Sequence, residues 1–264
     1  MNLETDTHNM SYAICHVPVV PLRSQPTDSS EMVSHILFGE CFEILERNGN
    51  WVKVKLSNDG YEGWIDYKSM LEIDKAIHTA YLKSKPILTS ELFAKISHSK
   101  GDFYVPMGSK LPLFHDKTFK IGEELYSYDG VTSPRKFDET TLIQVALSFL
   151  KAPYLWGGKT IFGIDCSGFT QIVMAQFGVS LFRDAYQQAT QGILVSFVLE
   201  AQTGDLAFFE NADGKIIHVG LILPDSQIVH AHGEVRIDSL DDMGIFNKKT
   251  GKHSHRLRFI KRFF

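Results

Sequence analysis

The sequence predicts an α+β protein, in which a β-rich N-terminal half precedes helices and an antiparallel sheet. Short strand-like runs separated by turn signals fill residues 11–74. Two helix-like runs follow, and an aspartate introduces each of them, Asp138 and Asp165. Further along, two apolar runs flank the turn signal at residues 224–226 and are typical of a strand hairpin.

The N-terminal half divides into a stronger and a weaker β pattern. Along residues 51–56, Val52, Val54 and Leu56 occupy one face of a half-buried strand, and Asn58-Asp59-Gly60 is a hairpin turn signal. Residues 75–134 form a second β-rich stretch with a weaker pattern. We expect linkers at residues 74–77 and 129–136. The predicted domains are therefore residues 1–74, 75–135 and 136–264.

Composition excludes several classes of function. The chain has 264 residues, of which 44% are hydrophobic, enough for one large domain or two to three small domains with real cores. A net charge of −4 argues against nucleic acid as a partner and against electrostatic capture by an anionic surface. Cys15, Cys41 and Cys166 have no paired spacing, so we expect no disulfide framework, no metal site and no cofactor.

Targeting signals are not visible in the sequence. Residues 1–8 lack a basic region followed by an apolar stretch, and no run approaches the roughly 18 apolar residues of a membrane span. We therefore expect a cytoplasmic protein without a membrane partner, or a periplasmic or secreted one if the sequence was trimmed before Met1. The sequence does not indicate an oligomeric state, and a monomer is compatible with it.

Cys166 stands at the start of the second predicted helix, after the Gly-rich residues 156–163 and before the apolar face of residues 169–177. A thiol in the first helical turn feels the positive end of the backbone dipole, which favours the reactive thiolate. A single buried cysteine is more often a small core residue. The assignment of Cys166 as a nucleophile therefore depends on its partners.

Two histidines lie on the strands of the predicted hairpin. A turn centred on residue 224 places His218 directly opposite His230, with their Cβ atoms roughly 5 Å apart. A base histidine that is oriented by a second polar side chain needs this arrangement. His232 shares that face but lies diagonally, so His230 is the better orienting residue unless the register shifts. Together with Cys166, these residues suggest a cysteine hydrolase.

A series of segments in the C-terminal half carries a family resemblance. They are Ala152-Pro153-Tyr154-Leu155-Trp156-Gly157-Gly158, Asp165-Cys166-Ser167-Gly168-Phe169, Arg183-Asp184-Ala185-Tyr186-Gln187-Gln188, Gly204-Asp205-Leu206-Ala207-Phe208-Phe209, His218-Val219-Gly220 and Val229-His230-Ala231. In order and spacing, the region 136–264 resembles the NlpC-type, papain-like cell-wall cysteine peptidases of bacteria. The resemblance implies Cys166 as nucleophile, His218 as general base and His230 as the third polar residue. Relatives usually carry a small residue in place of His232. We expect Tyr154 to donate to the oxyanion alongside the Cys166 amide.

A second resemblance covers the N-terminal half. Its motifs are Leu22-Arg23-Ser24, Leu37-Phe38-Gly39-Glu40, Gly49-Asn50-Trp51 and Gly63-Trp64, which resemble a bacterial SH3-like barrel. Residues 101–114 suggest a second, degenerate barrel. Two such barrels before an NlpC-type domain resemble the γ-D-glutamyl-L-diamino acid endopeptidases of murein peptide recycling. That resemblance implies that the first barrel closes one end of the groove, which then accepts a free N-terminal L-Ala-D-Glu unit.

The same resemblance implies a set of substrate-binding residues: Glu40 and Tyr61 from the first barrel, with Trp156, Ser167 and Asp184 from the catalytic domain. A free ammonium in a closed pocket needs carboxylate partners. Taken alone, Glu40 is more often a solvated turn charge, Tyr61 a barrel aromatic and Asp184 a surface acid.

Rival functions are a general peptidoglycan hydrolase whose barrels bind polymeric wall, a non-catalytic murein-binding protein, and an acyltransferase, which would be expected to bring lipid-facing segments. The sequence does not indicate which diamino acid follows D-Glu or how long a stem peptide fits.

Overall fold

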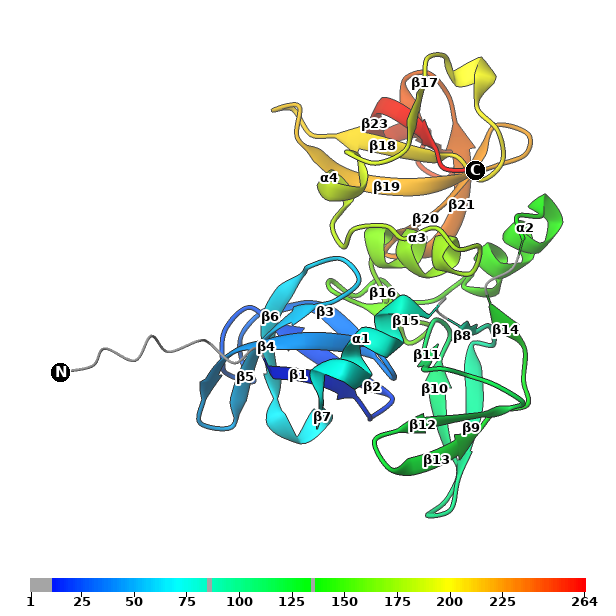
Figure 1. Cartoon of the computed structure of the whole chain (residues 1–264). Coiled ribbons are helices and arrows are strands. Elements are labelled where there is room, and N and C mark those ends of the chain that lie inside the picture. The colour runs from blue at the N-terminus through cyan, green and yellow to red at the C-terminus, as the bar shows by residue number, and fades with distance from the viewer. Residues whose placement is uncertain (1–10, 85–86, 134–135) are drawn as a thin grey trace.

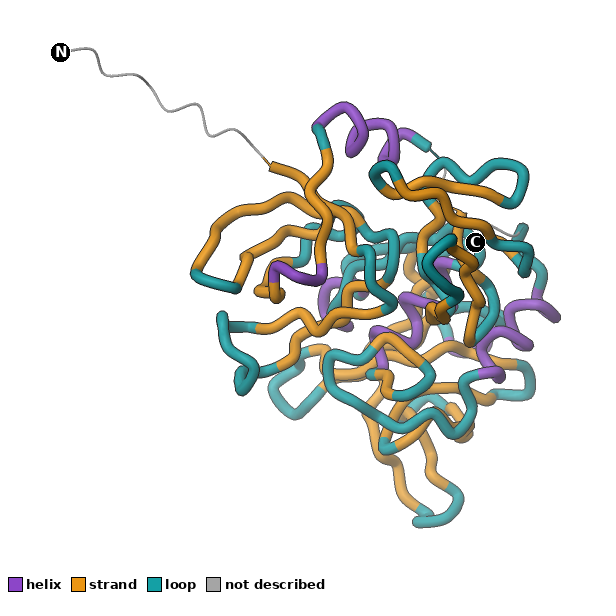
Figure 2. The backbone as a smooth tube through the Cα atoms, turned by 90° about the horizontal axis from the view of Figure 1, so that it is seen from below, coloured by secondary structure: helices purple, strands orange, loops and turns teal. Residues whose placement is uncertain are grey.

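The computed structural model describes residues 11–84, 87–133 and 136–264 (Figure 1). Residues 1–10, on which the expectation about an export signal rests, lie outside the described residues, as does part of the expected linker at 129–136. Among the helices of the described residues, none combines the length and the apolar character needed to cross a membrane. Strands dominate the chain and the helices are short (Figure 2). The predicted α+β class is confirmed.

The first β unit is a seven-stranded antiparallel sheet of order β3-β2-β6-β5-β4-β1-β7. Its strands are β1 (Ser11–Cys15), β2 (Val19–Arg23), β3 (Met32–Leu37), β4 (Cys41–Asn48), β5 (Trp51–Leu56), β6 (Glu62–Asp66) and β7 (Met70–Ile73). The 3-10 helix η1 (Tyr67–Ser69) precedes β7. The predicted alternation is confirmed, because Val52, Val54 and Leu56 of β5 are all buried. The predicted turn between β5 and β6 is also present, with Gly60 at a φ of 71°, where glycine is favoured because it has no Cβ.

Residues 74–77, predicted as a linker, lie at the start of the helix α1 (Lys75–Lys83), of which Asp74 is the N-cap. This helix packs on the first β unit through His78, whose ring stacks on Tyr12 with centroids 4.1 Å apart. The His78 Nε2 atom also lies 2.9 Å from Ser57 Oγ in a hydrogen bond. Sequence periodicity missed the helix because it buries only this one residue.

The second β unit contains two small antiparallel sheets, of orders β10-β9-β13-β12 and β11-β8-β14. Its strands are β8 (Ile87–Thr89), β9 (Phe93–His98), β10 (Phe103–Pro106), β11 (Lys110–Leu111), β12 (Thr118–Ile121), β13 (Glu124–Ser127) and β14 (Thr132–Ser133). Phe38 of the first unit packs against Phe103, Phe119 and Tyr126 of the second. The two units therefore share one apolar cluster.

The C-terminal half combines helices with a seven-stranded sheet of order β17-β23-β18-β19-β20-β21-β22. Its elements are α2 (Glu139–Ser148), β15 (Lys159–Thr160), β16 (Gly163–Ile164), α3 (Cys166–Ala175), α4 (Ala185–Gln188), β17 (Ile193–Val195), η2 (Val198–Glu200), β18 (Leu206–Glu210), β19 (Ile216–Leu223), β20 (Gln227–His232), β21 (Glu234–Leu240), β22 (Gly244–Asn247) and β23 (Lys252–Arg262). Because β22 also pairs with β23, six of these strands close into a ring. Both predicted helices are confirmed, and Asp138 accepts a hydrogen bond from the Thr141 amide at the start of α2.

The helix α3 lies between this sheet and the N-terminal units (Figure 1). Phe169 and Val173 of α3 belong to the same apolar cluster as Val219 of β19 and Val229 of β20. Leu37 from the first β unit and Met107 from the second join that cluster. The start of α3 therefore faces both the sheet that carries the histidines and the N-terminal half.

Candidate active site

The start of α3 is fixed by Asp165. One carboxylate oxygen accepts the Gly168 amide at 2.6 Å and the other accepts the Gly157 amide at 2.8 Å. Asp165 thereby caps the helix and anchors the Gly-rich loop that precedes it. Cys166 follows as the first helical residue and is 6% exposed.

The start of α3 favours the thiolate form of Cys166, whereas the burial of its side chain opposes that form. Burial, and then the neighbouring Asp165 carboxylate, raise the pKa of the Cys166 thiol to about 12. The amide of Val219, the residue next to His218, acts in the opposite direction and places the sulfur against β19. Desolvation therefore outweighs the helix dipole. The thiol must lose its proton to a base during the reaction.

His218 and His230 meet as an imidazole pair. His218 Nε2 lies 2.8 Å from His230 Nδ1 in a hydrogen bond, and both side chains are buried. Burial, and then His230, hold the pKa of His218 well below its usual value. His218 is therefore neutral at neutral pH and able to accept a proton.

The predicted register of the hairpin is wrong, because the turn is centred one residue later than predicted. The observed pairs Leu221–Val229 and Leu223–Gln227 centre the hairpin on residue 225, and both Asp225 and Ser226 adopt positive φ angles of 57° and 53°. This register brings Gly220 opposite His230, and a Cβ on Gly220 would lie 3.0 Å from the His230 Cβ atom. The two histidines remain on one face because the shift preserves the strand parity.

Two further histidines surround the pair. The His255 ring from β23 stacks on His218 with centroids 4.2 Å apart. The His232 ring is exposed and lies 6.4 Å from His218 between centroids. Sequence analysis missed His255, because nothing in its local pattern shows that β23 folds back beside β18.

A cavity of about 350 Å³ opens at Cys166. It brings together Cys166, Ser167, Asp184, Trp156 and Tyr61 with residues that the sequence did not single out for this site, Glu31, Val33, Asp165, Ala185, Tyr186, Ile216 and Ile217. The Tyr61 hydroxyl from the first β unit donates to Asp184, 3.1 Å and 3.2 Å from its two oxygens. The indole of Trp156 donates to Glu31 at 2.7 Å. The first β unit therefore forms part of the wall.

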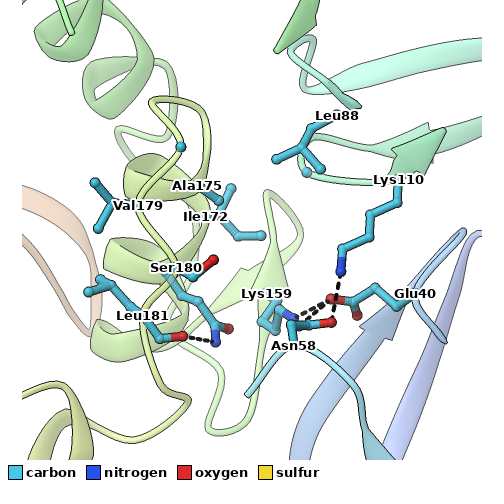
Figure 3. Close-up of a pocket in the computed structure, with 13 residues that line it drawn as sticks. Glu40, Asn58, Leu88, Lys110, Lys159, Ile172, Ala175, Val179, Ser180 and Leu181 are labelled. Carbon is cyan, nitrogen blue, oxygen red and sulfur yellow. Dashed lines mark hydrogen bonds and ion pairs between the residues drawn. The ribbon is translucent and has the colours of Figure 1, made fainter. Parts of the chain in front are cut away.

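Glu40 does not line this cavity, contrary to its predicted place beside the substrate. Its carboxylate accepts the Leu37 amide at 2.8 Å and the Asn58 side chain at 3.1 Å, and it lies 3.5 Å from Lys159 Nζ. Glu40, Asn58 and Lys159 line a different cavity, of about 100 Å³, where the two β units meet α3 (Figure 3). Glu40 is buried and already paired. Glu31 is the carboxylate residue of the first β unit that lines the cavity at Cys166.

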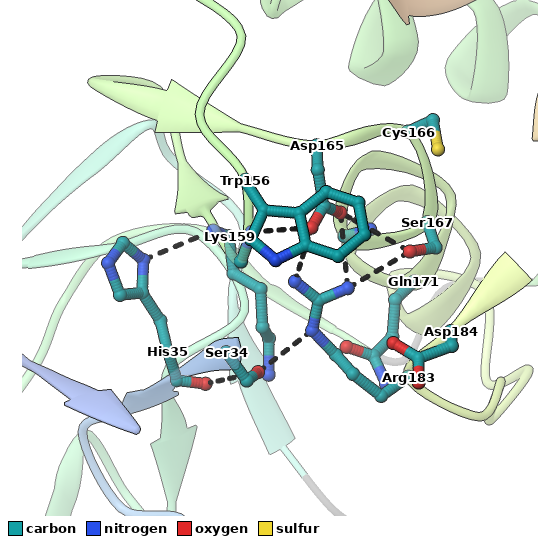
Figure 4. Close-up of polar contacts among 12 residues, drawn as sticks. Ser34, His35, Trp156, Lys159, Asp165, Cys166, Ser167, Gln171, Arg183 and Asp184 are labelled. Atoms are coloured by element: carbon teal, nitrogen blue, oxygen red, sulfur yellow. Dashed lines mark hydrogen bonds and ion pairs between the residues drawn. The ribbon is translucent and has the colours of Figure 1, made fainter. Parts of the chain in front are cut away.

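Arg183 supports the site from beneath (Figure 4). Its guanidinium contacts Asp165 at 2.6 Å and donates to the Ser167 hydroxyl at 3.0 Å. It also donates to Ser34 of the first β unit at 2.8 Å. Figure 4 draws no contact between the Cys166 side chain and this network. Sequence analysis quoted Arg183 within a motif but did not predict this role, because its partners are distant in the chain.

Tyr154 packs against the apolar cluster that includes Cys166. Burial, and then the neighbouring Cys166, raise the pKa of its phenol. Its hydroxyl therefore stays protonated, as an oxyanion donor requires. The role of Tyr154 as that donor stays a prediction.

Comparisons with known proteins agree with this geometry. Residues 151–254 match the NlpC/P60 family, and residues 22–70 match the bacterial dipeptidyl-peptidase Sh3 domain. The chain is 33% identical over 217 residues to the gamma-D-glutamyl-L-lysine dipeptidyl-peptidase of Bacillus subtilis, which covers 75% of this chain and 71% of the relative. It is 28% identical over 254 residues to the protein of the same name from Bacillus cereus, covering 85% of this chain and 75% of the relative. The crystal structure of an NlpC/P60 family protein from Bacillus cereus has the same fold, with a TM-score of 0.78 at 21% identity over 96% of this chain and 99% of that chain.

Fold and site together define a cysteine peptidase with a papain-like catalytic domain and an N-terminal SH3-like domain. The chain belongs to the NlpC/P60 family.

Substitution of the three histidines should separate their roles. We expect His218→Ala to lower kcat by roughly 10²–10⁴-fold on any peptide that the enzyme cleaves, because it removes the base. His230→Ala should lower kcat by less, since water can take over part of the role of a group that only orients the base. His232→Ala should lower kcat least, because the His232 ring is exposed and its centroid lies 6.4 Å from that of His218. Steady-state kinetics of the three folded variants check this order, and a larger loss for His232→Ala than for His230→Ala would contradict it.

Proposed function

We propose that the enzyme hydrolyses the γ-D-glutamyl–L-diamino acid bond of peptidoglycan-derived peptides that carry a free N-terminal L-Ala. The observation that carries this proposal is the shared cavity, in which Glu31 and Tyr61 of the first β unit lie with Cys166 and Asp184. Two relatives named gamma-D-glutamyl-L-lysine dipeptidyl-peptidases support the substrate class.

Two carboxylates would recognise the free α-ammonium of the substrate. Glu31 and Asp184 both line the cavity. Burial raises the pKa of Asp184, even though Arg183 beside it acts in the opposite direction. A substrate ammonium would therefore stabilise the ionised form of Asp184, and charge-assisted hydrogen bonds of this kind are stronger than neutral ones.

The reaction begins when the Cys166 thiol passes its proton to His218. The sulfur then attacks the γ-carbonyl carbon of D-Glu, and a tetrahedral oxyanion forms. The C–N bond breaks as His218 returns the proton to the leaving amine of the diamino acid, and a thioester remains on Cys166. Water, deprotonated by His218, hydrolyses the thioester to release the L-Ala-D-Glu product and restore the thiol.

Three substrates distinguish this proposal from its rivals. They are a free L-Ala-γ-D-Glu-diamino acid peptide, its N-acetylated form and intact sacculi. Cleavage of the free peptide alone supports the proposal. Release of soluble fragments from sacculi favours a general peptidoglycan hydrolase, for which the SH3-like domain would bind polymeric wall. Binding without cleavage of any of them favours a non-catalytic murein-binding protein.

The contribution of the first β unit can be tested at Glu31. We expect Glu31→Gln to lower kcat/KM on the free peptide by roughly 10-fold, because it removes one charge-assisted contact to the ammonium. The variant should handle an N-acetylated peptide as the wild type does. Glu40→Gln is the matched comparison, since its carboxylate is bound by Leu37, Asn58 and Lys159.

Glu40→Gln should leave the preference for free over N-acetylated peptide unchanged, whatever it does to stability. Kinetics with both peptides measure this preference for each variant. Equal turnover of the two peptides by the wild-type enzyme would show that the first β unit does not select for the free amine.

A further inference from the structure

His230 has a hydrogen-bond partner on each ring nitrogen, although its side chain is completely buried. Nδ1 lies 2.8 Å from His218 Nε2, and Nε2 lies 3.1 Å from Asp238 Oδ2. In the proposed reaction His218 is the base and His230 orients it, and Asp238 has no role so far.

Asp238 is held in place by its neighbours on the sheet. Its side chain is 7% exposed. The β20–β21 register pairs Ile228 with Asp238 and His230 with Arg236, so the carboxylate reaches His230 diagonally across the two strands. Arg236 donates to Asp238 Oδ1 at 2.8 Å, and its Nε atom lies 2.8 Å from Oδ2, so Oδ2 is shared between the Arg236 guanidinium and His230 Nε2. The arrangement is a buried chain of contacts rather than a surface ion pair.

The hydrogen bonds fix where the protons lie. An ionised carboxylate only accepts, and a neutral imidazole has one N–H and one lone pair. His230 must therefore carry its proton on Nε2 and accept at Nδ1 from His218 Nε2–H. His218 is then left with its lone pair on Nδ1, which is the nitrogen able to take the proton of Cys166. One carboxylate thus determines the tautomers of both rings.

We propose that Asp238 is a positioning residue of the active site, which sets the tautomers of His230 and His218 and stabilises the charge that His218 gains from Cys166. The proton moves from the Cys166 sulfur to His218 Nδ1 and no further, so His230 and Asp238 keep their protonation states. The inference rests on the proposed roles of Cys166 and His218 and is independent of which peptide is cleaved.

Other titratable groups face the imidazole pair from every side. His255 of β23 stacks on His218, and its ring centroid lies 5.9 Å from that of His230. His232 of β20 lies 6.3 Å from His230 between ring centroids. Arg236 of β21 contacts Asp238, and Cys166 of α3 faces β19. Tautomers should therefore be measured near pH 8, where ordinary histidines are neutral.

Asp238→Asn tests the proposal with little change in shape. An asparagine can turn its amide N–H toward His230 Nε2, which permits the opposite tautomer with the proton on Nδ1. His230 would then donate to His218, whose own proton would move to Nδ1 and block the base. We expect kcat to fall roughly 10- to 100-fold, less than removal of a general base itself, with KM changed by less than about twofold. Asp238→Glu, which keeps an acceptor, should recover part of the loss.

Nitrogen-15 NMR of the histidine rings reads the tautomers directly. We expect the wild-type enzyme to carry the His230 proton on Nε2, and Asp238→Asn to carry it on Nδ1. Asp241→Asn is the matched control, because Asp241 also binds a histidine, His253, at 2.8 Å on the neighbouring hairpin. This control should keep both the tautomers and kcat of the wild type.

Alkylation of Cys166 by iodoacetamide gives a readout that needs no peptide. The rate should fall in Asp238→Asn and stay unchanged in Asp241→Asn, even if the proposed substrate class is wrong. A wild-type His230 with its proton on Nδ1 would overturn the proposal without any variant. An unchanged kcat in Asp238→Asn, or a lower kcat with unchanged tautomers, would overturn it as well.

Discussion

Cys166→Ser is expected to abolish peptide hydrolysis, by roughly 10⁴-fold or more, while the fold stays intact. Burial already raises the pKa of the thiol to about 12, and a serine hydroxyl holds its proton still more tightly. Turnover of the L-Ala-γ-D-Glu-diamino acid peptide with a free amino terminus measures the effect, and circular dichroism checks the folding of the variant.

A second buried cysteine supplies the control. Cys41 lies in the apolar cluster shared by the two β units, away from the Cys166 cavity. Cys41→Ser should therefore keep the activity of the wild type. Substantial turnover by Cys166→Ser would remove Cys166 from the role of nucleophile.

The raised pKa of Cys166 also gives the alkylation rate a definite pH dependence. Because the thiol is protonated at neutral pH, the thiolate fraction should increase steadily as the pH rises. We expect the rate of modification by iodoacetamide at Cys166 to keep increasing up to about pH 10. A plateau at neutral pH would instead indicate a resting thiolate paired with protonated His218. Cys166 should react faster than Cys15 or Cys41, because it lines the large cavity.

Local sequence signals predicted the parts of the site that depend on neighbours in the chain. Asp165 before an apolar helical face predicted the start of α3, and the two apolar runs around residues 224–226 predicted the β19–β20 hairpin. Strand parity placed His218 and His230 on one face, even though the predicted register was wrong. That error arose because the positive φ angles of Asp225 and Ser226, which centre the turn, cannot be read from the pattern of apolar residues.

Contacts between distant segments could not be predicted in this way. Arg183 meets Ser34, and Glu31 meets Trp156, across the boundary between the first β unit and the catalytic domain. Asp238 reaches His230 only because of the β20–β21 register. Family resemblance named both Tyr61 and Asp184 as substrate-binding residues, and the structure brings their side chains into contact. Their role in binding stays a prediction. It misplaced Glu40, because a carboxylate in a matching motif does not show whether other groups already bind it.

Arg183→Met is expected to give the largest loss of stability among the substitutions considered. The Arg183 and Asp165 side chains are 1% and 6% exposed, and their closest atoms are 2.6 Å apart. Removal of the guanidinium leaves the Asp165 carboxylate buried without its cation, which typically costs about 3–5 kcal/mol. For a chain of this size, that loss corresponds to a decrease in Tm of roughly 6–20 °C. Thermal unfolding followed by tryptophan fluorescence measures the shift.

Two further variants show whether the unpaired charge is the cause. Arg47→Met breaks an ion pair with Glu72 at 2.8 Å in which the side chains are 48% and 58% exposed, and exposed pairs contribute at most about 1 kcal/mol. The double variant Arg183→Met with Asp165→Asn removes both buried charges but keeps a side chain that can cap α3. It should therefore be more stable than Arg183→Met alone. If Arg183→Met shifts Tm no more than Arg47→Met does, the buried pair does not hold the start of α3, and the fixed position of Cys166 must depend on the two amide contacts of Asp165 instead.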